Sequence, residues 1–276
     1  GTIGRTLVSL LHDHDVHFKV LVRNEEKAKP LNDIGIETCI GELGDWSSIA
    51  SALSNIDSVF LLTGPSMNKV DEQNGFIDLA KKEGIRKIVK IPAVGAQTGS
   101  KVHLADWHGQ IEDHLKNSGL EYIILRPHSF MQNMLMHLDT IKNQNCFYES
   151  LGDSKIPMID TRDIAQAAYD CLMRDDLNNQ TYVLTGPSSI SFEEMTKALS
   201  NATDRTINCI HVSAEAHNQG MKAAGVPDWL ADDLTAMRSD WNQIPVNEPT
   251  SDFNKISKTK QYDVSQFAKD HATYFT

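Results

Sequence analysis

Residues 1–5 read GTIGR, and residues 6–11 continue directly as TLVSLL. The apolar spacing predicts a helix that begins at two glycines three residues apart. Gly1 and Gly4 match the last two glycines of a G-x-x-G-x-x-G loop, in which glycine lets the backbone approach a pyrophosphate. The free N–H groups and the dipole of the first helical turn favour that negative charge. Because two glycines near a terminus are also simply flexible, the motif needs support from the residues that follow.

The second signal is an arginine that ends a short apolar strand. Residues 18–22, FKVLV, predict the strand, and Arg23 follows it. In a βαβ dinucleotide fold, an acidic residue about 20 residues after the glycines holds the ribose hydroxyls of NAD, whereas an arginine suits the 2′-phosphate of NADP. Lys27 stands one helical turn further on, so both cations could contact one phosphate. We therefore predict NADP(H) in preference to NAD(H); the alternative is a solvated basic turn.

Strands and helices alternate through the first half of the chain. We expect strands at 18–22, 36–40, 58–62, 87–91 and 122–126, and helices near 4–14, 25–34, 47–53, 70–83 and 104–117. This alternation predicts an α/β fold of the Rossmann type, with a doubly wound parallel sheet and right-handed crossovers. A helix beginning in 159–165 and a strand at 182–186 are expected to return to this domain.

The last third of the chain has a different character. Ser191 and Glu194 form a capping-box pattern that opens a helix. The residues beyond it read as helical and polar, with breaks at Pro227, Pro245 and Pro249. We predict a small, mostly helical C-terminal lobe. The predicted domains are an NAD(P)-binding Rossmann domain at 1–132, completed by 156–186, and a smaller substrate-side lobe at 133–155 and 187–276.

Composition narrows the classes of function. Charged residues make up 23% of the 276 residues and the formal net charge is −11, so an extended basic surface for nucleic acid is not expected. The cysteines are scattered, without a C-x-x-C pair or a His/Cys cluster, which indicates a reducing compartment and argues against structural zinc. No apolar run reaches transmembrane length and no signal peptide precedes the glycines. We expect a cytoplasmic protein with a small-molecule substrate, no metal and no membrane association, which could form a homodimer.

Turn residues follow three of the expected strands, at 63–65 (TGP), 92–93 (PA) and 127–129 (PHS). Open α/β sheets bind ligands outside the carboxyl ends of their strands. Three such turns beside a glycine loop favour a cofactor cleft, although Gly and Pro also serve ordinary turns.

These segments together resemble the NmrA-like, NAD(P)H-binding atypical short-chain dehydrogenase/reductase family, and within it quinone oxidoreductase-type and triphenylmethane reductase-like proteins. The segments that carry the resemblance are 1–5 (GTIGR), 22–24 (VRN) with Lys27, 41–43 (GEL), 89–91 (VKI) running to 95–96 (GA), 107–112 (WHGQIE), 118–122 (SGLEY), 125–133 (LRPHSFMQN) and 267–271 (FAKDH). They span nearly the whole chain. The likeness is specific for the family but not for a substrate.

The resemblance implies which residues hold the cofactor. The residues expected at the pyrophosphate are Gly1, Thr2, Ile3 and Gly4. Arg23 and Lys27 would bind the 2′-phosphate, and Glu42 and Leu43 the adenine. The residues expected on the nicotinamide side are Thr63, Gly64, Pro65, Ile91, Pro92 and Pro127.

Substrate contacts are expected on the segment after the last of these strands. His128 directly follows the strand end and is the residue best placed to contact a substrate. Phe130 and Met131 could form an apolar floor for a flat ring, although core packing is the commoner use of such residues.

The start of the chain departs from the family pattern, because the opening strand and the first glycine of the motif are missing. A central strand with about five apolar side chains represents about 8–15 kcal/mol of burial, which is comparable with the net stability of a domain. We therefore expect the natural protein to have about ten more residues upstream, enough for one strand and its turn.

A second departure is the absence of the Tyr-x-x-x-Lys pair of ordinary short-chain dehydrogenases. The helix expected at 104–117 instead carries His108 and Glu112, which are spaced to share one helical face. A histidine beside a carboxylate can donate a proton near neutral pH, so we predict both as catalytic residues. The alternative is a structural pair worth about 0.2–0.5 kcal/mol. Sugar epimerisation and alcohol oxidation, which need the tyrosine, are not expected.

Two functions fit a site without that tyrosine. The first is an NADPH-dependent oxidoreductase that transfers a hydride to a flat, electron-poor acceptor such as a quinone or a cationic dye, which needs mainly orientation and exclusion of water. The second is a non-catalytic NADP(H)-binding regulator of the NmrA type. A reductase or isomerase of the phenylpropanoid kind would need a catalytic lysine that the sequence does not place. We expect the oxidoreductase, and turnover of NADPH with a quinone separates it from the regulator.

Overall fold

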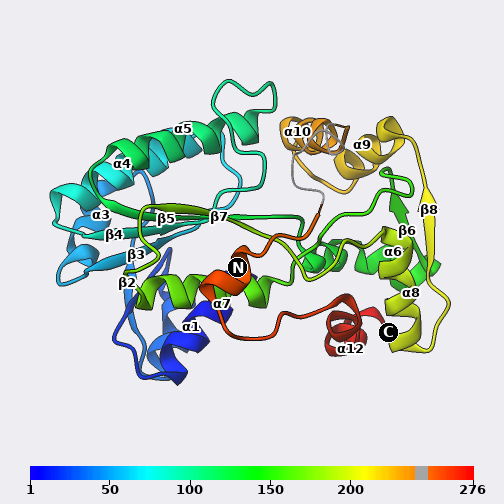
Figure 1. Cartoon of the computed structure of the whole chain (residues 1–276), viewed down its shortest axis with the longest axis horizontal. Helices are drawn as coiled ribbons and strands as arrows, with labels where there is room; N and C mark the ends of the chain where they lie inside the picture. Colours follow the sequence, from blue (N-terminus) through cyan, green and yellow to red (C-terminus); the bar gives the residue numbers. More distant parts are fainter. Residues whose placement is uncertain (240–247) are drawn as a thin grey trace. The chain divides into compact units, whose positions relative to one another are not determined.

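The computed structural model describes residues 1–239 and 248–276 and contains two compact units (Figure 1). The first unit comprises Gly1–Ser100, Ala105–Arg126 and Ala165–Tyr182. The second comprises Lys101–Leu104, Pro127–Ile164 and Val183–Thr276. The change of unit after Arg126 lies upstream of the domain boundary predicted at residue 132. The break predicted at Pro245 lies outside the described residues.

The first unit opens with helix α1 (Thr2–Asp13). Ile3, Leu7 and Leu11 recur every four residues and are buried, as expected for the apolar stripe of an amphipathic helix. Strand β1 (Lys19–Val22) pairs in parallel with β2 (Glu37–Ile40), from Lys19 opposite Glu37 to Val22 opposite Ile40. Helix α2 (Glu25–Asn32) connects these strands and starts at Asn24, whose side chain accepts a hydrogen bond from the Lys27 N–H.

A four-stranded sheet forms the centre of the fold, in the order β3-β4-β5-β7. Its strands are β3 (Ser58–Leu61), β4 (Lys87–Lys90), β5 (Glu121–Pro127) and β7 (Gln180–Leu184). Strand β4 pairs in parallel with β3 and β5, and all its residues are buried. Buried central strands of this kind need helices on both faces.

Helices cover the two faces of this sheet. They are α3 (Trp46–Ala50) with the 3-10 turn η1 (Ser51–Leu53), α4 (Lys69–Lys82), α5 (His103–Asn117) and α7 (Thr161–Met173). Figure 1 shows α4 and α5 on one face and α7 on the other. Phe76, Ile88 and Ile111 join α4, β4 and α5 in one apolar core. The predicted Rossmann-type fold is confirmed, except that the β1–β2 pair forms a separate sheet from the four strands.

The second unit contains helices and a further parallel pair of strands. Strand β6 (Cys146–Glu149) pairs with β8 (Asn208–His211), beginning with Cys146 opposite Asn208. Neither strand was expected from the sequence, because each is too short to show an alternating pattern and its partner is remote in sequence. The helices are η2 (Met131–His137, a 3-10 helix), α6 (Leu138–Gln144), α8 (Phe192–Thr203), α9 (Ala214–Ala223), α10 (Asp228–Ser239), α11 (Asp252–Ile256) and α12 (Val264–Phe275).

The predicted capping box is confirmed at the start of helix α8. Ser191 Oγ accepts a hydrogen bond from the Glu194 N–H at 3.1 Å, and Glu194 Oε2 accepts one from the Ser191 N–H at 2.8 Å. Phe147 of β6, Met195 of α8 and Phe267 of α12 are buried in one core. Within the described part of the chain, no helix has both the length and the hydropathy that crossing a bilayer requires.

Candidate active site

The N-terminus of α1 is suited to an anion. Gly1 is the N-cap residue, no side chain in the described part of the chain caps the helix, and its first turn has no acidic residue. Apart from its chain neighbours and the backbone of α1, no heavy atom of the described residues lies within 4 Å of a Cβ atom built at Gly1 or Gly4, so the backbone is open to a close ligand. The first N–H groups of a helix lack intrahelical partners and lie at the positive end of its dipole. Thr2, Ile3 and the two glycines therefore fit a pyrophosphate, and contact with it remains a prediction.

The residues predicted for the adenosine half follow β1 and β2. Arg23 and Lys27 are exposed, at the end of β1 and in the first turn of α2. Glu42 and Leu43 follow β2, where the Glu42 N–H donates to Ser48 Oγ at 3.3 Å and so orders the turn. The carboxyl ends of parallel strands lie at one edge of a sheet, which brings both turns to the edge where such folds bind ligands.

The residues predicted for the nicotinamide half follow β3 and β4. Thr63 is half-buried, whereas Gly64 and Pro65 are exposed, and Ile91 and Pro92 are buried. In the parallel register Leu61 lies opposite Lys90, so both turns leave the same edge of the four-stranded sheet. Contact of these residues with a nicotinamide ring remains a prediction.

A buried polar network occupies this edge. Lys90, the last residue of β4, is fully buried, and its Nζ donates to Gln73 Oε1 at 2.6 Å. Gln73 Nε2 donates in turn to Thr63 Oγ1 at 2.6 Å, and Lys69 Nζ donates to the same oxygen at 3.2 Å. Lys69 and Gln73 both come from α4 and are 2% and 1% exposed. The network therefore links the ends of β3 and β4 through α4.

Burial changes the acidity of the two lysines. It lowers the pKa of Lys90 to about 7, with the positive charge of Lys69 as a second cause. Burial also lowers the pKa of Lys69 to about 8. Buried groups with shifted pKa values gather at functional sites. No catalytic role was assigned from the sequence to Lys69, Lys90 or Gln73. The available signal was Lys90, a lysine between the apolar residues Val89 and Ile91.

His108 lies on α5 close to these charges. It is 9% exposed, and its Nδ1 has no hydrogen-bond partner among residues 1–239 and 248–276. Burial, followed by the positive charges of Lys90 and Lys69, lowers the pKa of His108 to about 2. The imidazole is therefore neutral at physiological pH. A neutral imidazole can still donate a hydrogen bond, but it is not the protonated acid that the sequence analysis expected.

Glu112 contacts residues other than His108, which was its predicted partner. It is 1% exposed, and its two oxygens accept hydrogen bonds from Arg126 Nε at 2.9 Å and Nη2 at 2.6 Å. Lys116 Nζ adds a third contact at 3.3 Å. The structure thus pairs Glu112 with Arg126 of β5 rather than with His108. Helical spacing correctly predicts a shared face, but a bidentate arginine on a neighbouring strand is the stronger partner.

The residues predicted for the substrate lie in the second unit, as does Pro127. His128 and Met131 are each 2% exposed, and Met131 belongs to the apolar core of that unit. Phe130 is partly buried and forms a β-bridge with Ile159. Met131 therefore packs in the core, which was the alternative to a role in binding a flat ring. Contact of any of these residues with a substrate remains a prediction.

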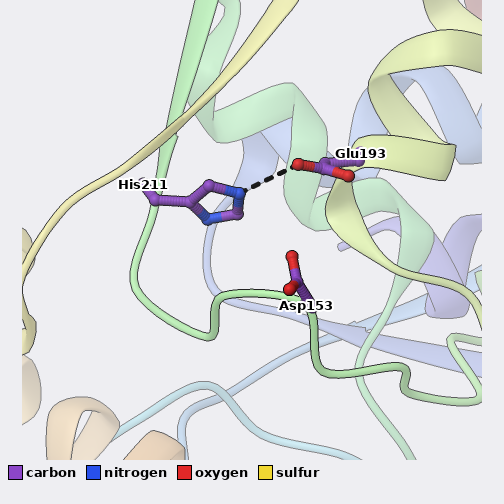
Figure 2. Close-up of side chains that lie close together, drawn as sticks. All are labelled: Asp153, Glu193 and His211. Atoms are coloured by element: carbon purple, nitrogen blue, oxygen red, sulfur yellow. Dashed lines mark hydrogen bonds and ion pairs between the residues drawn. The ribbon is translucent and has the colours of Figure 1, made fainter.

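A separate cluster of metal-type ligands lies on the second unit (Figure 2). Asp153, Glu193 and His211 each place one ligand atom within 4.8 Å of the others, and all three are exposed. Figure 2 shows the His211 ring directed at Glu193, whose Oε1 lies 3.1 Å from His211 Nε2. His211 and Glu193 contact each other directly, exposed acidic groups are common on a protein with a net charge of −11, and we assign no metal to the cluster.

Comparison with known proteins shows the family to which this chain belongs. A family model described as NAD(P)H-binding matches residues 1–175. The NAD(P)H azoreductase of Xenophilus azovorans is 32% identical over 275 residues, which covers 100% of this chain and 96% of the relative. The chain therefore belongs to this NAD(P)H-binding family, and the predicted NmrA-like, atypical short-chain dehydrogenase/reductase membership is confirmed.

Other relatives and solved structures agree with this membership. Quinone oxidoreductase 2 of Escherichia coli (strain K12) is 27% identical over 215 residues, covering 78% of this chain and 75% of the relative. The fold matches the crystal structure of Citrobacter sp. triphenylmethane reductase complexed with NADP(H), with a TM-score of 0.85 at 20% identity over 99% of this chain and 97% of that one. It also matches the NADPH-dependent quinone oxidoreductase of Escherichia coli complexed with NADPH, with a TM-score of 0.86 at 23% identity over 98% and 96% of the two chains.

Proposed function

We propose that this protein is an NADPH-dependent oxidoreductase that transfers a hydride to a flat, electron-poor small molecule such as a quinone, an azo compound or a cationic dye. The observation that carries the proposal is 32% identity, over the whole chain, to a protein named NAD(P)H azoreductase. The names of the quinone and triphenylmethane reductases among the relatives support the same class of acceptor. The regulator named as the alternative has no comparable support. A cytoplasmic location is part of this proposal.

The residues present fit a dinucleotide. When bound, NADPH would supply the hydride from its dihydronicotinamide ring. The uncapped first turn of α1 would hold the pyrophosphate through backbone N–H groups. Arg23 and Lys27 would pair with the 2′-phosphate, and Thr63 and Pro92 would flank the ring. These assignments rest on the strand ends and helix terminus at which the residues stand.

His108 and Glu112 take different roles in this proposal. His108 is neutral, so it would offer a hydrogen bond to the bound ring or acceptor rather than a protonated acid. Glu112 would hold Arg126 and so fix α5 against β5, which keeps His108 in position. The substrate roles of His128 and Phe130 remain part of the proposal.

Consumption of NADPH with and without a simple benzoquinone tests the function. Quinone-dependent consumption supports the oxidoreductase, whereas tight NADPH binding without consumption favours the regulator. Arg23→Ala should weaken binding of NADPH far more than binding of NADH, since only NADPH carries the 2′-phosphate. Lys82→Ala, at the exposed C-terminal end of α4, is a matched control that removes a cation elsewhere in the unit. Equal losses for both cofactors in Arg23→Ala would show that Arg23 does not contact that group.

A further inference from the structure

The hydrogen bonds around Thr63 determine where its hydroxyl proton can go. Lys90 Nζ donates a hydrogen bond to the oxygen of the Gln73 amide at 2.6 Å. The amide is thereby oriented, and its Nε2 must donate to Thr63 Oγ1. Lys69 Nζ donates to the same oxygen. A hydroxyl has two lone pairs and one hydrogen, so both lone pairs of Thr63 are occupied.

The Thr63 hydroxyl hydrogen is consequently available to a ligand. Within residues 1–239 and 248–276, none of the hydrogen bonds of Thr63 uses its hydroxyl as the donor. Thr63 is only half-buried, and it stands two residues past the end of β3, at the edge where ligands bind in such sheets. The neighbouring Lys69 ammonium is 2% exposed and has no other acceptor among the side chains described here than Thr63. The Thr63 hydroxyl is therefore an oriented hydrogen-bond donor whose oxygen accepts a hydrogen bond from the Lys69 ammonium.

We propose that Lys69 and Thr63 form a proton relay that delivers the one proton an acceptor oxygen needs besides the hydride, with Gln73 and Lys90 as positioning residues. This inference rests on the proposed function, because it assigns the proton that accompanies the hydride.

The step balances for a quinone. The quinone accepts the hydride, with its electron pair, at one carbonyl oxygen, which becomes a hydroxyl, and the other oxygen becomes a phenolate. The Thr63 O–H bond breaks as an O–H bond forms on that oxygen. An N–H bond of the Lys69 ammonium breaks as its proton moves to Thr63 Oγ1, and Lys69 becomes a neutral amine. Water reprotonates the amine after the hydroquinone leaves. Burial lowers the pKa of Lys69 to about 8, which makes the ammonium a better acid than an exposed lysine.

Two acceptors separate this relay from a general role of Thr63 in binding. A quinone needs a hydride and a proton, whereas a cationic triphenylmethane dye needs only a hydride, because the hydride adds to its central carbon cation and gives a neutral product. Thr63→Val removes the hydroxyl with little change of shape. We expect it to lower the ratio of quinone rate to dye rate at least tenfold, since a positioned general acid contributes on the order of 10²–10⁴-fold.

Further variants identify the parts of the relay. Thr63→Ser should restore the ratio, because the hydroxyl returns. Lys69→Met should also lower the ratio of quinone rate to dye rate, as Thr63→Val does. Thr38→Val, a threonine of β2 outside the network whose hydroxyl donates to Asn32, is the matched control and should leave the ratio unchanged. A Thr63→Val protein that loses both rates equally, or neither rate, would overturn the relay.

A binding measurement tests the donor without turnover. 4-Nitrophenolate is an anionic oxygen probe whose absorbance near 400 nm reports its ionised form. We expect the natural protein with NADP⁺ to bind this probe at least tenfold more tightly than Thr63→Val does. If the natural protein reduces neither acceptor, the proposed function fails, and the probe alone then decides the donor. Equal affinity in both proteins would overturn the assignment of Thr63 as a donor.

Discussion

Replacing Arg126 with leucine should destabilise the first unit strongly, because Glu112 is left as a buried charge. The carboxylate is 1% exposed and Arg126 Nη2 lies 2.6 Å from it. Breaking a buried ion pair by removing one partner costs about 3–5 kcal/mol. Lys116 remains at 3.3 Å and is partly exposed, so we expect a loss near the lower value, about 3 kcal/mol. Urea denaturation followed by circular dichroism measures it as a lower midpoint of the transition.

Two further proteins make this result decisive. The double variant Glu112→Leu with Arg126→Leu should recover much of the stability, because an apolar pair of similar volume can replace a buried ion pair. Lys29→Met breaks an exposed pair with Asp33 and should leave the midpoint unchanged. NADPH consumption per folded molecule of the double variant then shows whether Glu112 has a catalytic role. An Arg126→Leu protein as stable as the Lys29→Met control would refute the reasoning.

Three other perturbations have defined outcomes. His108 has a folded pKa lowered to about 2, so its contribution to stability is present above pH 6.5 and is lost as the pH falls. Between pH 7 and pH 5 the natural protein should lose about 2 kcal/mol that His108→Leu does not lose, measured by urea denaturation at both pH values. Burial raises the pKa of Asp163 to about 8, so its contribution is present at low pH and is lost as the pH rises through 8. Asp163→Asn should remove a decline on the order of 3 kcal/mol between pH 5 and pH 8, and an unchanged pH profile would contradict the assignment. Gly109→Ala would place a Cβ 2.9 Å from the Gln97 Cα and against the Thr98 N–H, so it should lower the thermal midpoint, at a cost of about 1–3 kcal/mol. Gly220→Ala, in a helix with open space around it, is the control and should be neutral or stabilising by up to about 1 kcal/mol.

Local signals in the sequence were sufficient to predict most of the first unit. The alternation of apolar strands with helices led to the parallel fold, and Ser191 with Glu194 predicted the start of α8. These features depend on residues close together in the chain, where periodicity and capping act. The β6–β8 pair was missed because its two short strands find each other only through the packing of the second unit.

The choice of partners in the buried site was decided by the tertiary structure. The sequence by itself determined that His108 and Glu112 share a face of α5, since helical spacing does not depend on context. It could not determine that Arg126 would bind Glu112, because that contact requires β5 to pack beside α5. The burial of Lys90, and with it the orientation of Gln73 and Thr63, likewise exists only once β3, β4 and α4 are assembled. The pKa values and hydrogen-bond partners of buried groups depend on desolvation and on the charges that the fold brings together. The spacing of residues along the chain does not determine either of these.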